Sequence, residues 1–141
     1  MDWSMAENEK EGTLYFAGAC RPNPGHAGIA YVLYDSHGYV VDEFNSLIDP
    51  YPLSSNAAHY RALIDGLRSA SNFGFTHIVA CGHLELISNQ FNGRCACRKP
   101  NMQRYQRKVR KIGSFFEDLQ IQHVSEDENS YTRSLVQECF M

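Results

Sequence analysis

The apolar residues of this chain change their spacing at one point, and that change limits the folds open to it. Before residue 49, three short runs rich in apolar, β-branched and aromatic residues, over residues 13–19, 27–34 and 39–48, are separated by turn residues, as strands are. The tetrapeptide Asp35-Ser36-His37-Gly38 between the last two runs is typical of a tight hairpin. The first third of the chain is therefore predicted to form three antiparallel strands.

After the segment Asp49-Pro50-Tyr51-Pro52, which we expect to end the third strand, helical and strand patterns take turns. Strands are predicted at 76–81 and 120–124, and helices at 54–70, 84–91, 101–117 and 129–140. Strands joined through a helix pair in parallel. We expect an α/β fold with a five-stranded mixed sheet, three antiparallel strands and then two parallel ones, flanked by helices. It forms one domain over 13–141, after a loose N-terminal segment over 1–12.

The positive charge of the chain is concentrated in one segment. The net charge is -3, yet 8 of the 13 Lys and Arg residues lie between Arg94 and Lys111, and no Asp or Glu lies between Leu86 and Phe116. On the predicted helix at 101–117, helical spacing separates an apolar stripe from a basic stripe of Arg104, Arg107, Lys108 and Lys111. A basic ridge on an otherwise acidic body suits a phosphate backbone, although such a stripe is also an ordinary solvated helix face.

The cysteines and the hydropathy pattern favour a cytoplasmic or nuclear protein. Five cysteines, an odd number, indicate free thiols in a reducing compartment. No apolar run reaches the length of a membrane span, and the polar, acidic start at residues 1–12 is unlike a signal peptide. We expect no membrane partner.

Four stretches occur in the order and spacing of a known family. They are FAGACRPNPG at 16–25, SSNAAHYRAL at 54–63, CGHLELI at 81–87, and HV at 123–124 followed by Asn129 and a last helix. Together they resemble the ribonuclease H-like fold, and within it the plant-type ribonuclease H or reverse-transcriptase-like domains. The resemblance covers about residues 14–140.

The resemblance implies a chemistry that needs four carboxylates. Members of this family hydrolyse the RNA strand of an RNA/DNA hybrid with two Mg²⁺ ions, which require hard oxygen ligands. The four corresponding positions are Ala17, His59, His83 and Arg133. Imidazole is a poor Mg²⁺ ligand and guanidinium is always cationic. We therefore predict that the chain is not an enzyme but an inactive ribonuclease H-like domain, with no metal and no cofactor.

Three functions remain open at this stage. The first is binding of RNA/DNA hybrid or RNA without cleavage, through the basic stripe and through positions that contact the hybrid in the family, namely Cys20, Arg21, Asn23, Ser54, Ser55 and Asn56. Two of these residues have an equally good structural interpretation, since Asn23 suits a turn and Ser54 suits a helix cap.

The second function is that of a protein-interaction or scaffolding module, as in a larger ubiquitin-ligase-type protein. The third is hydrolysis that uses Glu85 with one of the acids at 126–128, for which their spacing gives no support. Separately, His59 and His83 together could take up a transition metal such as Zn²⁺, although no third ligand is evident.

Overall fold

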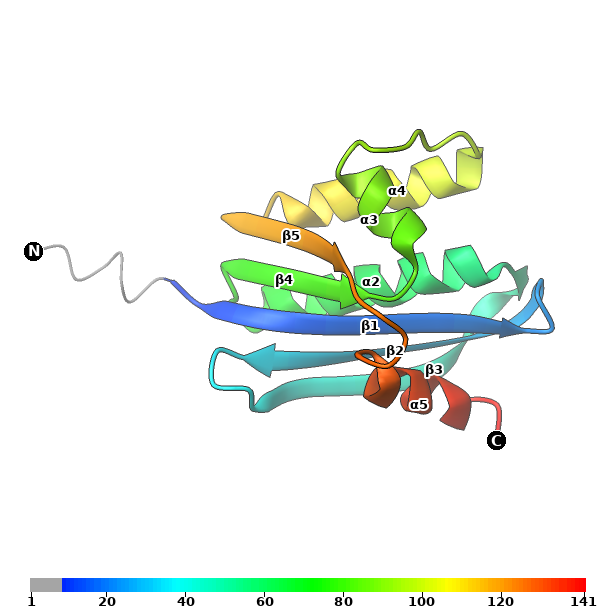
Figure 1. The fold of residues 1–141 in the computed structure, drawn as a ribbon, viewed down its shortest axis with the longest axis horizontal. Helices are drawn as coiled ribbons and strands as arrows, with labels where there is room; N and C mark the ends of the chain where they lie inside the picture. The colour runs from blue at the N-terminus through cyan, green and yellow to red at the C-terminus, as the bar shows by residue number, and fades with distance from the viewer. Residues whose placement is uncertain (1–8) are drawn as a thin grey trace, which may run out of the picture.

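The computed structural model describes residues 9–141, so residues 1–8 of the predicted loose segment lie outside the described residues. The strands are β1 (Glu11–Arg21), β2 (Gly25–Asp35), β3 (Val40–Leu53), β4 (His77–Gly82) and β5 (Asp118–His123). The helices are α2 (Ser55–Asn72), α3 (Glu85–Phe91), α4 (Pro100–Gly113) and α5 (Ser130–Glu138). Figure 1 shows the sheet with its helices on both sides.

The strands form one mixed sheet in the order β3-β2-β1-β4-β5. The pairs β1–β2 and β2–β3 are antiparallel, while β1–β4 and β4–β5 are parallel. This arrangement confirms the predicted fold class, because the hairpin-linked strands and the helix-linked strands pair as their connections require.

The strand ends differ from the prediction by up to five residues, and for two of them, the start of β1 and the end of β3, the pairing gives the reason. β1 begins at Glu11, two residues earlier than expected, because Glu11 and Gly12 pair with His77 and Ile78 of β4. β3 continues through the proline-rich segment to Leu53, where pairing with Gly25 resumes after a register shift. β3 lies at the edge of the sheet, and Pro50 and Pro52 fall between the paired positions Ile48 and Leu53, so neither proline takes part in the pairing with β2.

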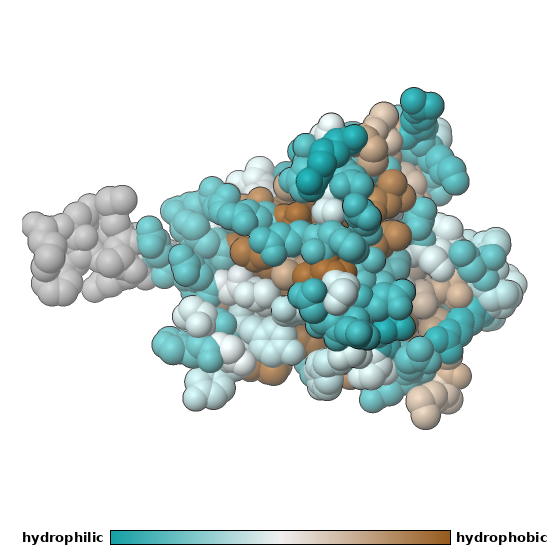
Figure 2. Space-filling model, in the orientation of Figure 1, coloured by the Kyte–Doolittle hydropathy of each residue, from teal (hydrophilic) through white to brown (hydrophobic). Residues whose placement is uncertain are grey.

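Alternate residues of β1 face two separate apolar cores. Leu14 and Phe16 pack in the larger core with α2 and α4, whereas Ala17 packs in a smaller core with Leu135 and Val136 of α5. The two faces of the sheet are therefore covered by different helices. On the face seen in Figure 2, hydrophilic residues cover most of the surface and apolar residues show only in narrow bands.

Helix α2 lies unusually close to β1, and this closeness sets the position of its first turn. A Cβ atom on Gly18 would stand 2.4 Å from the Ala58 carbonyl carbon and 2.6 Å from the His59 nitrogen. Only a residue without a side chain fits between the two backbones. The backbone of His59 is thereby held against the middle of β1.

Candidate nucleic-acid interface

The candidate site forms where β1 extends past the end of β4. The parallel pairing of these strands stops at Tyr15 and Cys81, so the next residues of β1 have an edge without a strand partner. Two side chains complete that edge. The Asn129 Nδ2 atom donates to the Phe16 carbonyl at 2.9 Å, and the Gly18 N–H donates to His59 Nδ1 at 3.3 Å. Satisfying buried backbone groups in this way brings α2 and α5 to one point of the sheet.

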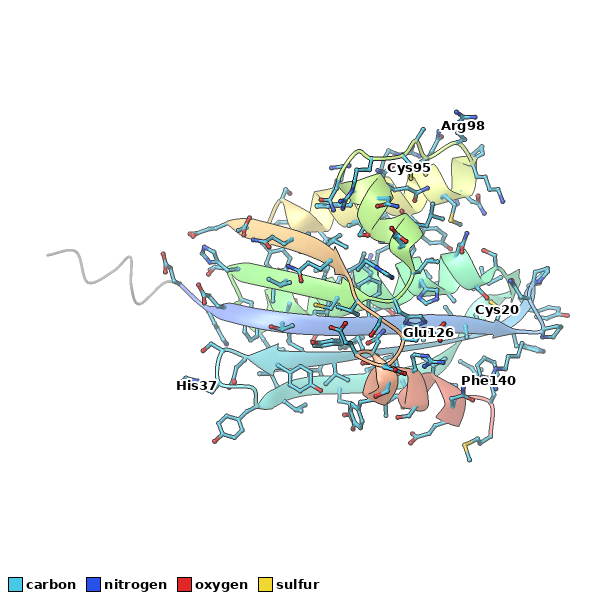
Figure 3. All side chains as sticks on the ribbon, in the orientation of Figure 1. Cys20, His37, Cys95, Arg98, Glu126 and Phe140 are labelled. Carbon is cyan, nitrogen blue, oxygen red and sulfur yellow. The ribbon has the colours of Figure 1, made fainter. Side chains whose placement is uncertain are left out.

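The four positions that the sequence singled out lie around this point. The His59 and His83 rings are in edge contact, with centroids 4.9 Å apart. Ala17 is buried on the α5 side of β1, between the two residues whose backbone groups are completed. Arg133 lies one turn into α5, where its guanidinium pairs with Glu126 at 3.8 Å. Figure 3 shows Glu126 over the middle of β1, beside the start of α5.

Both imidazoles of this cluster are neutral at pH 7. Burial and, to a smaller extent, the neighbouring His83 together lower the pKa of His59 to about 3. Burial also lowers the pKa of His83, and the Arg133 guanidinium adds to the effect, while Glu126 opposes it. Charging either ring would place a cation in a poorly solvated site, and a charged His83 would also stand near the Arg133 guanidinium.

The hydrogen bonds fix which nitrogen of each ring carries the proton. His59 Nδ1 accepts the Gly18 N–H, so its proton is on Nε2. Asn129 Nδ2 also lies 2.9 Å from His83 Nδ1 and donates to it, which places the His83 proton on Nε2 as well. Each ring therefore presents an N–H donor on the side turned away from the backbone.

Asn129 is the residue that joins these parts, and the sequence analysis gave it no role. It begins α5 but its side chain makes no helix-capping bond. Its two N–H groups instead serve Phe16 and His83, and its Oδ1 is the one buried side-chain polar atom without a partner in the described part of the chain. The signal in the sequence that could have identified it was its place in the family motif, after HV at 123–124.

The donor set of this cluster does not fit the two Mg²⁺ ions that the fold family implies. Magnesium needs carboxylate or carbonyl oxygens in octahedral geometry, whereas Ala17 has no donor atom, the two rings present N–H groups and Arg133 is a cation. Across residues 9–141, no three His, Cys, Asp or Glu side chains are grouped so that they could hold a metal ion.

Several of the other predicted contact residues meet at the start of α2. Asn23, in the turn after β1, accepts the Ser55 N–H at 3.1 Å, and the Ser54 hydroxyl caps α2 by accepting the Ala57 N–H at 3.1 Å. Asn56 lies next to them in the first turn and is partly exposed. These residues thus have a structural role. The polar atoms that are not used in these hydrogen bonds remain open to a ligand.

Two predicted contact residues lie apart from that group. Cys20 is buried, and its burial raises the pKa of the thiol. The Arg21 guanidinium lies over the Phe140 ring, 5.1 Å from its centroid, after the end of α5 (Figure 3). Cys20 is therefore unsuited to contact a ligand, while Arg21 is fixed at one end of the face that carries α5.

The basic stripe occupies a different region. Its four residues, all exposed, lie on α4, which packs against α2 rather than against α5. The acids of the third hypothesis are scattered in their contacts: Glu85 opens α3, Glu126 pairs with Arg133, and the Glu128 carboxylate accepts the Ser125 N–H. All five cysteines are free thiols. Among the described residues, no helix has the length and apolar character of a membrane crossing.

Comparison with known proteins gives one family and a consistent set of relatives. The sequence model of the family described as "Reverse transcriptase-like" matches residues 15–139. The protein named ribonuclease HI of Halobacterium salinarum is 34% identical over 124 residues, which are 88% of this chain and 61% of that protein. This chain therefore spans less than two thirds of that relative's length.

Solved structures agree with this result. The crystal structure of RNase H1 from Halobacterium salinarum is 32% identical, with a TM-score of 0.87 over 92% of this chain and 97% of that one. The crystal structure of LC11-RNase H1 in complex with an RNA/DNA hybrid is 28% identical, with a TM-score of 0.83 over 90% of this chain and 94% of that one.

These relatives contradict the prediction that the chain is not an enzyme. Over about nine tenths of its length the chain is similar to proteins that are named as ribonucleases H1. The prediction considered only the four positions that hold metal ligands in the family, here Ala17, His59, His83 and Arg133, and took the loss of those ligands to mean the loss of all catalysis. Carboxylates at those positions decide how Mg²⁺ is held, but their absence does not exclude catalysis by other groups, and imidazole is the commonest proton-transfer group in enzymes.

Proposed function

Because the chain belongs to the reverse transcriptase-like family and has the ribonuclease H-like fold, we propose that it binds RNA/DNA hybrid, with a backbone phosphate at the cluster of His59, His83 and Arg133. Support for the ligand class comes from LC11-RNase H1, whose structure contains such a hybrid. Support for the place comes from the hydrogen bonds of the cluster. A duplex with one RNA strand is read through its 2′-hydroxyls and its phosphates.

The observation that carries the proposal is the direction of the imidazole protons. Both rings use Nδ1 as an acceptor within the protein, so both keep Nε2–H as a donor, and the Arg133 guanidinium lies close enough to His83 to lower its pKa. N–H donors and a guanidinium are the groups that bind phosphate oxygens. A centre of carboxylates repels phosphate unless metal ions lie between them, and this centre removes that repulsion.

The electrostatic gain at the cluster is modest. A phosphate charge about 5 Å from the Arg133 guanidinium, at an effective dielectric constant of about 20, is attracted by roughly 3 kcal/mol. The Arg133 side chain is 37% exposed and shares its charge with Glu126, so we reduce the attraction to about 1 kcal/mol. Most of the affinity must therefore come from several phosphate contacts together.

Further contacts are proposed at the start of α2 and in the turn that precedes it. Ser55 and Asn56 present partly exposed polar side chains there. The Asn23 side chain bonds to Ser55 through its oxygen, so its amide N–H groups take no part in that bond. Arg21 extends this surface toward the end of α5. Small polar side chains of this kind hydrogen-bond phosphate and sugar oxygens.

The test is a titration of labelled RNA/DNA hybrid, followed by fluorescence anisotropy at low salt, with DNA duplex, double-stranded RNA and single strands as comparison ligands. We expect the hybrid to bind with a Kd well below about 100 µM, since even nonspecific binders reach that range. Absence of binding at that concentration would remove the proposal. Hydrolysis is measured on the same hybrid with Mg²⁺ or Mn²⁺ present.

A variant of Arg133 locates the contact. Arg133→Asp replaces about 1 kcal/mol of attraction by a similar repulsion, so the Kd for hybrid should rise about 30-fold. The matched control is Arg98→Asp, which makes the same change of charge on an exposed residue in the loop before α4, far from Glu126 in Figure 3. The control should change the Kd less than threefold. Equal effects of the two variants would show that only the net charge matters.

A second function, binding of a protein partner, is favoured by a separate observation. The edge strand β3 and the turn before it expose large apolar side chains, namely Tyr39, Val40, Phe44, Leu47 and Tyr51. Aromatic and apolar side chains on an exposed strand edge are typical of protein interfaces. Phe44→Lys should leave hybrid binding unchanged and abolish retention of any protein partner. Residence in the cytoplasm or nucleus stays a prediction.

A further inference from the structure

Helices α2 and α4 enclose a cleft of about 310 Å³ whose walls carry four cations. Arg61 and Arg68 come from α2, and Arg104 and Lys108 come from α4. A volume of this size is at the lower limit of small-ligand sites, and suits a phosphate with part of its sugar rather than a large molecule. Half of the basic stripe predicted from the sequence thus belongs to a concave surface.

Helical geometry explains why the four cations face one another. Arg61 and Arg68 are seven residues apart, so they lie on one side of α2, and Arg104 and Lys108 are four apart, so they lie on one side of α4. The polar side chains of Asn101 and Tyr105 also line the cleft.

The wall of the cleft that Tyr105 forms is rigid. The Tyr105 ring stacks on the buried Tyr60 ring, with centroids 5.9 Å apart and planes 9° apart. Tyr105 therefore cannot swing freely, and the wall that it forms keeps its shape.

The cleft is separate from the cluster of His59 and His83. Arg61 follows His59 by two residues, which on an α-helix is a turn of about 200°, and Arg68 follows it by nine, which is about 180° when whole turns are removed. Both arginines therefore lie on the side of α2 opposite to His59. One stretch of nucleic acid that follows the His59 side of α2 does not also enter the cleft.

The two helices differ in the acidic residues that they bring to the cleft. On the α2 side, Asp65 pairs with Arg68 at 3.7 Å. Burial raises the pKa of Asp65, while Arg61 and, to a smaller extent, Arg68 lower it. The two arginines therefore favour the charged form of the Asp65 carboxylate. Helix α4 brings no acidic residue. Arg104 and Lys108 thus have no carboxylate on their own helix, and both attract an anion that enters the cleft.

We propose that the cleft between α2 and α4 is a second phosphate site, which binds the phosphodiester groups of a nucleic acid independently of the His59–His83–Arg133 cluster. Arginine and lysine side chains converging in a cleft are suited to phosphate oxygens, since arginine forms paired hydrogen bonds with them and lysine supplies a compact charge. Binding of this kind is insensitive to sequence and strongly dependent on salt. The site gives the domain two faces that hold nucleic acid.

The test uses two double variants of the same helix. Arg104→Gln/Lys108→Gln removes two charges from the cleft, and the matched control Arg107→Gln/Lys111→Gln removes two charges from exposed positions of α4 that do not line it. The probe is a short DNA duplex, titrated at several salt concentrations. Because all four positions are exposed, both variants should keep the melting temperature of the parent chain.

We expect the cleft variant to weaken duplex binding about tenfold and to reduce the salt dependence by about two ions. The control should change the affinity less than threefold. Equal losses in both variants, or no loss in either, would overturn the proposal.

Two further arms separate the sources of the phosphate and the two sites. In wild-type chain, NMR amide shifts caused by the duplex should include residues 61–68 and 101–108, and inorganic phosphate alone should cause them only at much higher concentration. If inorganic phosphate saturates the cleft at the concentration of the duplex, the site is one for free phosphate and the proposal is wrong. Arg133→Asp should leave these shifts in place, so failure of the proposed function at the cluster is distinguishable from failure here.

Discussion

Asn129→Ala removes the side chain that joins β1, α5 and His83, and its cost can be worked out from the contacts. Without the Asn129 amide, the buried Phe16 carbonyl has no partner, which costs about 1–3 kcal/mol, and the half-buried His83 loses a bond worth about 1 kcal/mol. The change also removes the unpartnered Oδ1, which returns about 1 kcal/mol. The expected net loss is about 1–3 kcal/mol of unfolding free energy, or roughly 4–12 °C in Tm for a domain of this size.

Urea unfolding followed by circular dichroism measures this loss. The matched control is Asn92→Ala, because Asn92 also donates its amide to a backbone carbonyl, that of Ile121 at 3.3 Å, but is exposed to solvent. Water replaces the lost bond there, so the control should lose less than about 1 kcal/mol. If Asn129→Ala is no more destabilising than Asn92→Ala, then Asn129 does not hold the open edge of β1 and our description of the site is wrong.

Three other outcomes follow from the packing and the charges. Gly18→Ala should lower stability by about 3 kcal/mol, since its methyl group would overlap the Ala58 and His59 backbone; a soluble variant with wild-type Tm would refute the close contact of α2 and β1. The His59 pKa is lowered in the folded state, so the unfolded chain binds more protons between pH 6.5 and about 3, and unfolding free energy should fall with decreasing pH across that window by up to about 1.4 kcal/mol per unit. His59→Gln should remove that part of the slope, and an unchanged slope would contradict the pKa. Leu63→Asp should unfold the domain in a thermal melt, because it buries an unpaired charge at a fully buried position of α2.

Helix α2 shows what the sequence alone can predict. Its inward positions repeat at the helical period, and the structure buries every one that this period selects: Tyr60, Leu63, Ile64 and Leu67. The division of the sheet into antiparallel and parallel strands follows in the same way, because short turns join antiparallel neighbours and helical connections join parallel strands. The order of the strands does not follow, since β4 pairs with β1 and not with β3, which precedes it. The local sequence pattern is sufficient to predict an element wherever its buried positions recur at a regular spacing along the chain.

Contacts between distant segments could not be predicted in this way. Asn129 bonds to Phe16 across 113 residues of sequence, and no periodicity relates the two. The continuation of β3 to Leu53 depends on its position at the sheet edge, where proline is tolerated. The local sequence does not show which strand lies at the edge. Likewise, Arg104 and Lys108 come to line one cleft with Arg61 and Arg68 only because α4 packs on α2.

The prediction about catalysis failed for a different reason. The residues at the four positions were identified from the sequence, and the structure places His59 and His83 in contact and Arg133 beside them. The error was to conclude from the missing carboxylates that no catalysis occurs, when relatives over most of the chain are ribonucleases H1. What the structure changes is the interpretation of the cluster, from an empty metal centre to a set of N–H donors.

The most direct test of that interpretation is the dependence of hybrid binding on Mg²⁺. The Kd for RNA/DNA hybrid is measured at constant ionic strength, once with EDTA and once with Mg²⁺, on the intact chain. If phosphate is held by the imidazole N–H groups and Arg133, the two values should agree within about twofold, since no carboxylate remains to be neutralised. Binding that appears only when Mg²⁺ is present would contradict the account.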